Sequence, residues 1–455
     1  MQDQKLKNLA VMAAEACRKA GADEADAFIT QGSQMSVDIY EGAPEMFEHA
    51  EVSGAGIRAF RAGKMGYAYT ADLSEAALAK MAKKAYENAA ASDADEFNGL
   101  PEKEKIYSDV ESLRLTSEEF NKSTTKEKIE FALRIESEAK GFDTRVKGCE
   151  SVAYAEEAET VALANTNGFL SSYSRQTCYG FADAMAEDNN EVQTGFSYEA
   201  GRSLAELDAV FIGREAAERA TVMLGGRPMA PATITVVFDP LVFIQVLTAI
   251  APALSAEAAQ KGRSFLSNLV GKKIAPDFFS LVDDGLLPAG IASAPFDDEG
   301  VASRTTNIIE NGILRTLLFN AYAARKARVA PTGNGRRGSF KNAPGTSPTN
   351  LFVRPGKRTR QELIAETGDG LYVMGVQGLH AGVSAVTGQF SAGAYGLIIR
   401  NGKLAEPVRE ITIASTCGDI LANISAVAND LRFVPMGSGY GSPTVAVRNM
   451  VISGR

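Results

Sequence analysis

The sequence predicts an α+β protein with three parts: an N-terminal helix-plus-antiparallel-sheet domain (1–100), a middle α+β domain (113–226) and a larger mixed α+β C-terminal domain (230–455). Three observations support this prediction. The 455 residues exceed what one ordinary core holds. Runs with helical periodicity stand beside runs in which apolar and polar residues alternate. An acidic segment (92–116) and a segment with two prolines (227–232) interrupt these runs and indicate linkers.

The N-terminal domain is predicted to hold two helices and a small sheet. Apolar residues recur at helical spacing from Leu6 to Ala20, and Gly21 is a plausible end of this helix. Glycine-containing turns then separate four short strand patterns, which indicate an antiparallel sheet. These patterns cover 27–30, 35–40, 56–60 and 66–69. Ser74 is a natural N-cap for a second helix over 75–91.

The middle domain is predicted to begin with a charged helix over 123–140. Strand patterns follow, and Asn167-Gly168 separates those at 161–165 and 169–173. Asn-Gly between strands predicts a tight hairpin, because both turn residues tolerate positive φ.

A helix over 215–224 ends the middle domain, and a strand over 233–238 begins the C-terminal domain. Asp239 and Pro240 then start a helix, since Asp caps the first turn and Pro needs no hydrogen-bond acceptor there. Further predictions are hairpins at Asn311-Gly312 and Asn401-Gly402, a helix over 419–427, and strands over 444–447 and 450–452.

Composition excludes some classes of protein. The formal net charge of −9 argues against a general binder of nucleic acids or anionic membranes. Four scattered cysteines without CxxC spacing are expected to be buried thiols. No signal-peptide pattern and no apolar run of membrane-spanning length is visible, so we expect a cytoplasmic protein with no membrane or nucleic-acid partner.

Residues 311–361 contain eleven Lys or Arg and no Asp or Glu. Two interpretations have equal weight: a solvated face paired with nearby acids, or a recognition surface for an acidic partner or a peptide carboxylate. Arg336 and Arg337, on a glycine-rich loop, are the best candidates for contacting another molecule. The acidic triplet 297–299 is expected to be a turn that faces water, rather than a metal site.

Seven glycines punctuate residues 375–402 and indicate loops shaped around close contacts. The part containing Thr387 and Gln389 either lines a peptide groove or forms tight turns between strands. His380 is expected to be a loop histidine bonded to backbone; the alternative is an unorthodox metal site that it shares with Cys417 or an acid.

Several motifs, in this order, resemble the TldD/PmbA family, whose members are paired subunits of bacterial and archaeal metalloproteases. These motifs are 54–58, 63–67, 296–300, 308–314, 331–337, 378–396, 400–408, 429–431 and 441–443. The resemblance covers nearly the whole chain and implies the family's α+β domains.

The resemblance also indicates a branch within the family. Catalytic members carry HExxxH on a helix early in the last domain and a cysteine near the C-terminus; the two histidines bind zinc and the glutamate activates water. Here the corresponding positions hold Leu247, Thr248 and Pro252, and residues 434–441 contain no thiol. The chain is therefore similar to the PmbA (TldE) branch, which lacks the metal site.

What the resemblance implies is a metal-free subunit of a cytoplasmic TldD/TldE-type metalloprotease that acts on unfolded or small peptides. Its partner would be a TldD-like subunit holding the zinc, or a second copy of itself; this chain would bind no cofactor. Candidate contacts to peptide or partner are Arg336, Arg337, His380, Thr387 and Gln389. Two alternatives stay open: a homodimeric peptide- or partner-binding protein without catalysis, and an independent metallopeptidase with an unorthodox site.

Overall fold

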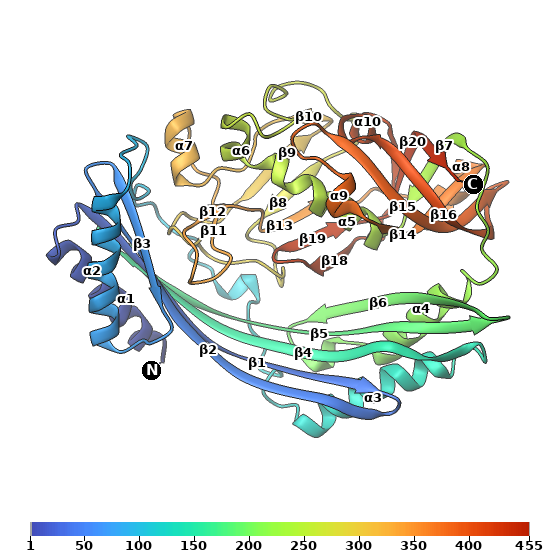
Figure 1. The fold of residues 1–455 in the computed structure, drawn as a ribbon, viewed down its shortest axis with the longest axis horizontal. Coiled ribbons are helices and arrows are strands. Elements are labelled where there is room, and N and C mark those ends of the chain that lie inside the picture. Colours follow the sequence, from blue (N-terminus) through green and yellow to red (C-terminus); the bar gives the residue numbers. More distant parts are fainter. Residues whose placement is uncertain (1, 455) are drawn as a thin grey trace.

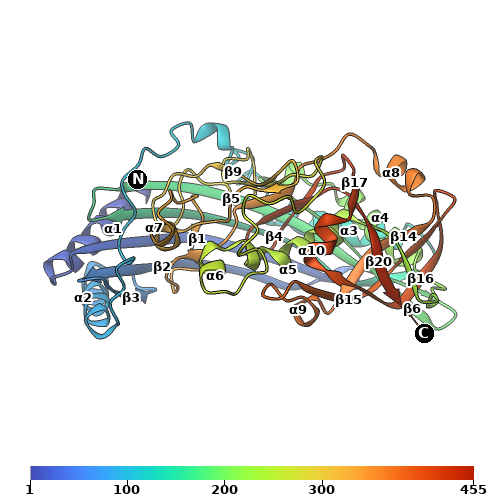
Figure 2. The same cartoon turned by 90° about the horizontal axis from the view of Figure 1, so that it is seen from above.

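The computed structural model describes residues 2–454 and confirms the α+β class. A long, curved antiparallel sheet lies on one side, and the C-terminal domain lies against its concave face (Figure 1). Seen from above, the long strands run lengthwise beneath that domain (Figure 2). The two cavities described below lie between the sheet and this domain.

The long sheet has six strands in the order β3-β2-β1-β4-β5-β6. Its strands are β1 (Glu24–Tyr40), β2 (Ala43–Arg61), β3 (Lys64–Thr70), β4 (Val146–Asn165), β5 (Leu170–Asp188) and β6 (Glu191–Gly201). β1 pairs with β2 on one side and with β4 on the other, so the segments predicted as the first and middle domains share one sheet.

The two short strands expected at 27–30 and 35–40 are one continuous strand, β1. The glycine between them, Gly32, pairs with Val52 of β2 and Glu159 of β4 and does not turn the chain. A Cβ atom at Gly32 would lie 2.2 Å from the carbonyl oxygen of Ala158. Gly32 therefore allows two backbones to approach closely. The sequence alone does not distinguish a glycine in this role from a glycine in a turn.

Four helices cover the convex face of the long sheet (Figure 1). They are α1 (Gln2–Lys19), α2 (Glu75–Ala91), α3 (Thr125–Lys140) and α4 (Ala209–Thr221). The predicted cap of α2 is confirmed, because the Ser74 hydroxyl accepts the N–H of Ala77 at 3.3 Å. α4 starts six residues before the predicted 215, since Asp208 accepts the N–H groups of Val210 and Phe211.

The predicted linker 92–116 is extended but packed against the protein. It contains the short 3₁₀ helix η1 (Glu111–Leu113), and both Leu113 and Leu115 are buried beside Phe296 of the C-terminal domain. A second 3₁₀ helix, η2 (Leu204–Glu206), precedes α4.

The C-terminal domain contains two six-stranded sheets around the largest core. One has the order β16-β15-β14-β7-β20-β17, and an additional β16–β20 pairing closes five of its strands into a ring. Its strands are β7 (Ala232–Phe238), β14 (Gly370–Gln377), β15 (Gln389–Arg400), β16 (Lys403–Thr416), β17 (Ile424–Val427) and β20 (Val445–Ser453).

The other sheet has the order β10-β9-β8-β13-β19-β18. Its strands are β8 (Leu281–Asp284), β9 (Thr305–Glu310), β10 (Ile313–Leu314), β13 (Asn350–Val353), β18 (Arg432–Pro435) and β19 (Gly439–Ser442). A two-stranded pair, β11 (Gly335–Arg336) and β12 (Gly345–Thr346), stands apart. The helices are α5 (Pro240–Ile250), η3 (Ala251–Leu254), α6 (Ala256–Gln260), α7 (Ala321–Ala327), α8 (Arg360–Thr367), α9 (Leu379–Gly382) and α10 (Cys417–Ala422).

The two later Asn-Gly hairpins are confirmed, with positive φ at both residues of each turn. The first hairpin also exists, but only Gly168 has positive φ there, so the turn is not of the predicted tight type. The predicted helix 419–427 is wrong in its second half, which is strand β17 paired with β20. The two predicted closing strands are one strand, β20, with an irregularity at Asn449.

Among residues 2–454, we find no helix that combines the length and the apolar character needed to cross a membrane.

The packing of α2 on β3 depends on Gly66. A Cβ atom there would lie 2.0 Å from the carbonyl oxygen of Ala85 and 2.1 Å from the amide nitrogen of Ala89. Gly66→Ala should therefore destabilise the protein by about 1–3 kcal/mol, because the helix must move away. Urea unfolding compared with Gly345→Ala measures this, since a Cβ atom at Gly345 meets nothing within 4 Å. Equal midpoints for the two variants would contradict the assigned packing.

Candidate functional site

A buried ion network joins the long sheet to the C-terminal domain. Arg58 of β2 donates to Asp26 of β1 from Nε at 2.9 Å and to Glu299 from Nη1 at 2.7 Å. Arg337 donates to the other oxygen of Asp26 at 3.1 Å. Burial disfavours the charge on Arg58, but Asp26 and Glu299 outweigh this effect and raise the pKa of its guanidinium. The network fixes the C-terminal domain over one end of the sheet.

The acidic triplet is buried, so the prediction of a turn facing water is wrong. Asp297, Asp298 and Glu299 are 1%, 6% and 1% exposed. Asp297 accepts three backbone N–H groups, Asp298 accepts the N–H of Arg337, and Glu299 holds Arg58. Burial and the neighbouring Glu299 raise the pKa of Asp297. These carboxylates order the loops beneath the sheet.

Arg337, which was predicted to contact another molecule, is engaged within the protein. Its side chain is fully buried, bonds to Asp26 and the Tyr67 hydroxyl, and stacks its guanidinium 5.1 Å from the centre of the Phe28 ring. The basic segment was expected to pair with nearby acids or to form a recognition surface, and most of it is engaged within the protein. The engaged members besides Arg337 are Arg315 with Glu310, Arg325 with the carbonyls of Phe97 and Leu100, Lys326 and Lys341 over aromatic rings, Arg354 with Asn307, Arg358 with Glu366, and Arg360 with Tyr372.

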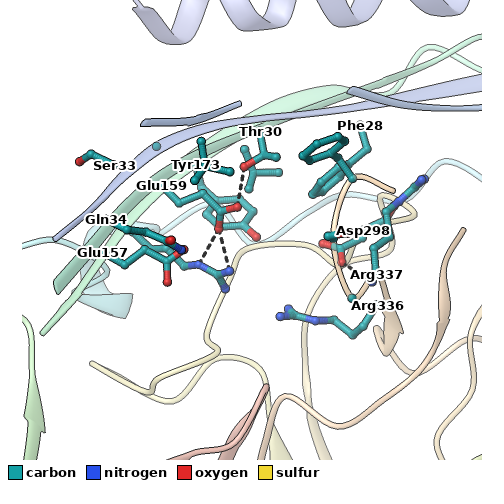
Figure 3. A pocket seen from close by; sticks show the side chains of 17 residues that line it. Phe28, Thr30, Ser33, Gln34, Glu157, Glu159, Tyr173, Asp298, Arg336 and Arg337 are labelled. Carbon is teal, nitrogen blue, oxygen red and sulfur yellow. Dashed lines mark hydrogen bonds and ion pairs between the residues drawn. The ribbon is translucent and has the colours of Figure 1, made fainter. Parts of the chain in front are cut away.

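Arg336 differs from its neighbour, because its side chain has no hydrogen bond or ion pair within residues 2–454. It points into a cavity of about 250 Å³ between the sheet and the C-terminal domain, which we call the Arg336 cavity (Figure 3). On the sheet side of this cavity, Arg175 pairs with Glu159 at 2.7 Å, and Glu159 also accepts the Thr30 hydroxyl.

A second cavity, of about 460 Å³, lies between the sheet and helix α5. We call it the α5 groove. Four aromatic side chains of β5 and β6 form its sheet side, and Leu241, Ile244 and the segment 434–436 form the other side. The aromatic residues are Tyr179, Phe181, Phe196 and Tyr198.

Sequence reasoning missed the α5 groove. The available signal was the spacing of the aromatics, because Tyr179 and Phe181, like Phe196 and Tyr198, are two residues apart and so face one side of a strand. The register pairs Phe181 with Tyr198, which brings both sets together. The Tyr198 hydroxyl is buried and has no hydrogen-bond partner within the described residues.

The positions in α5 and η3 that the family resemblance aligns with a zinc site do not fit that metal. Leu247 is buried in the C-terminal core, and Pro252 lies in η3. Neither side chain has a lone pair that could bind a metal ion. The Thr248 hydroxyl donates to the carbonyl of Ile244 at 2.9 Å and lies 3.5 Å from the sulfur of Met436. Over residues 2–454, no three His, Cys, Asp or Glu side chains are grouped so that they could hold a metal ion.

The remaining candidates lie apart from Arg336. His380 is exposed on the short helix α9, Thr387 is exposed in the turn before β15, and Gln389 is exposed at the first position of β15. None of the three lines the Arg336 cavity or the α5 groove. Cys417 is buried, as are the other cysteines, and burial raises the pKa of its thiol to about 11. The structure therefore provides no grouping of these residues into one site.

Removing one partner from the buried network should destabilise the protein strongly. Arg58→Met leaves the buried Glu299 without its arginine partner and leaves Asp26 with Arg337 alone, and it should cost about 3–5 kcal/mol. Arg315→Met removes the exposed pair with Glu310 and should cost less than about 1 kcal/mol. Urea unfolding of both variants measures the difference. A similar loss in both would show that the network does not hold the two bodies together.

Comparison with known proteins identifies the family. Three family models match successive segments: PmbA/TldA metallopeptidase domain 1 over 25–89, the central domain over 118–224 and the C-terminal domain over 231–454. A metalloprotease PmbA homolog of Haemophilus influenzae is 29% identical over 460 residues, which cover 100% of this chain and 97% of that protein. Metalloprotease PmbA of Escherichia coli O157:H7 is 29% identical over 414 residues, covering 90% and 88%.

Solved structures agree with these matches. A candidate modulator of DNA gyrase from Thermotoga maritima has a TM-score of 0.87 and 28% identity, covering 97% of this chain and 98% of that one. TldE from Thermococcus kodakarensis has a TM-score of 0.88 over 99% and 100% of the two chains; its 21% identity makes this a likeness of fold. The resemblance stated from the motifs is confirmed, and this chain belongs to the PmbA/TldD family of metalloproteases.

Proposed function

We propose that this chain is the PmbA/TldE-like subunit of a cytoplasmic TldD/TldE-type metalloprotease that cleaves unfolded or small peptides, and that the zinc belongs to its partner. The observation that supports this proposal most directly is the set of side chains in α5 and η3. Leu247, Thr248 and Pro252 stand where catalytic relatives carry HExxxH, and they supply no ligand and no general base.

The α5 groove supports a role in peptide handling. Its walls are aromatic and apolar, which suits burial of apolar side chains from an extended peptide. Unfolded chains expose such side chains and folded proteins bury them, so the groove favours the former. In this role the subunit binds and orients a peptide, and the partner supplies the hydrolytic chemistry.

The free part of β2 supports association with another chain. β3 pairs only with residues 55–61 of β2, so residues 43–52 form an open and exposed edge. Met46 and Phe47 on this edge are 49% and 50% exposed. Open strand edges pair readily with other strands. The same edge also suits a second copy of this chain, which is the arrangement expected for a homodimeric binding protein without catalysis.

Assembly with a catalytic chain tests the proposal. We expect this chain alone to hold no stoichiometric zinc and to cleave no peptide, whereas co-expression with a TldD-like chain that carries HExxxH should yield a heteromeric complex with chelator-sensitive peptidase activity. Size-exclusion chromatography with light scattering, metal analysis and a peptide assay measure this. Failure to form a heteromer would favour the homodimer. Zinc that this chain alone retains after dialysis, together with peptide cleavage by this chain alone, would contradict the proposal.

Restoring the helix motif alone should not create a protease. The variant with Leu247→His, Thr248→Glu and Pro252→His still lacks a thiol ligand in residues 434–441, so its zinc site would be incomplete. We expect no peptide cleavage above that of the parent chain when zinc is added. Because Leu247 is buried, circular dichroism must first show that the variant is folded. Robust cleavage by the folded variant would refute the argument from the missing thiol.

A further inference from the structure

The Arg336 cavity holds one guanidinium that the protein does not use. Arg175 is paired with Glu159, and Arg337 is paired with Asp26. Arg336 has no such partner among residues 2–454, although it is only partly exposed. A guanidinium in a recess, with its donors free, is suited to bidentate contact with a carboxylate.

The opposite side of the cavity carries an unused carboxylate. Glu157 of β4 is exposed and has no hydrogen-bonded or ion-paired partner within the described chain. Figure 3 shows Glu157 and Arg336 on different sides of the cavity. A positive and a negative group are therefore both available to one small molecule.

We propose that the Arg336 cavity binds a small zwitterion, namely a free amino acid or a dipeptide. Its carboxylate would contact Arg336, and its ammonium group would face Glu157. Phe28, Tyr173 and Phe340 also line the cavity and offer apolar surface to a side chain of the ligand. The volume of about 250 Å³ lies below the range typical of sites for drug-sized ligands. The cavity therefore suits a ligand as small as a free amino acid or a dipeptide.

The charges disfavour a phosphate compound. A phosphate group carries nearly two negative charges at neutral pH, whereas the cavity offers one unpaired cation together with the carboxylates of Glu157 and Asp298. A zwitterion carries one charge of each sign, so its carboxylate can pair with Arg336 and its ammonium group with Glu157. This inference concerns a site distinct from the α5 groove, and it stands whether or not the chain joins a catalytic partner.

Calorimetric titration of the full chain with Leu-Leu tests the inference. We expect saturable binding that weakens at least tenfold for Leu-Leu amide, which lacks the carboxylate, and at least tenfold in Arg336→Met. N-acetyl-Leu-Leu and the variant Glu157→Gln should each bind severalfold more weakly. Arg328→Met is the matched control, because Arg328 is an exposed arginine of the same basic segment outside the cavity, and it should bind like the parent.

Three results would overturn the inference: no saturable binding of Leu-Leu, equal affinity for the acid and the amide, or an unchanged affinity in an Arg336→Met variant with the parent's thermal midpoint. Inorganic phosphate is the test of the alternative anion. Binding of phosphate tighter than Leu-Leu, and lost in Arg336→Met, would assign the cavity to phosphate compounds and refute the zwitterion.

Discussion

The arrangement of this protein depends on two arginines that share one aspartate. Asp26 accepts Arg58 from its own sheet and Arg337 from the C-terminal domain, and Arg58 reaches on to Glu299. Charges this deeply buried are stable only when their hydrogen bonds are satisfied, so the network tolerates little relative movement of the two bodies. Both cavities lie between these bodies, and their shapes therefore depend on this contact.

The two cavities differ in chemistry although one sheet forms a side of each. Toward β6 the concave face carries aromatic rings, and α5 opposes them. Around the middle of β1 it carries charged groups, and the loop after β11 opposes them. Arg202 lies buried between β6 and the C-terminal domain, where it donates to the carbonyl of Gly290; burial lowers the pKa of this guanidinium to about 10.

Local patterns predicted two helix caps and two hairpin turns. Ser74 and Asp239 cap their helices as expected, and the hairpins at 311–312 and 401–402 form, because such signals act within a few residues. The joining of β1 to β4 was not predictable, since no local signal records which distant strand pairs with which. Arg336 and Arg337 were singled out together; their different surroundings depend on tertiary packing, which puts one in a cavity and the other in the ion network.

The pairing of β1 with β4 also bears on how the chain folds. Asp26 of β1 is paired with Asn165 of β4. The central strand β1 therefore cannot complete its pairing until β4, about 140 residues later in the chain, has been synthesised. During synthesis the first helix and hairpin emerge with one side of β1 uncovered, in a state open to misassociation until β4 arrives. A fragment ending in the 92–116 segment would keep that side uncovered permanently. The pairing of the first hundred residues is thus incomplete until β4 is present.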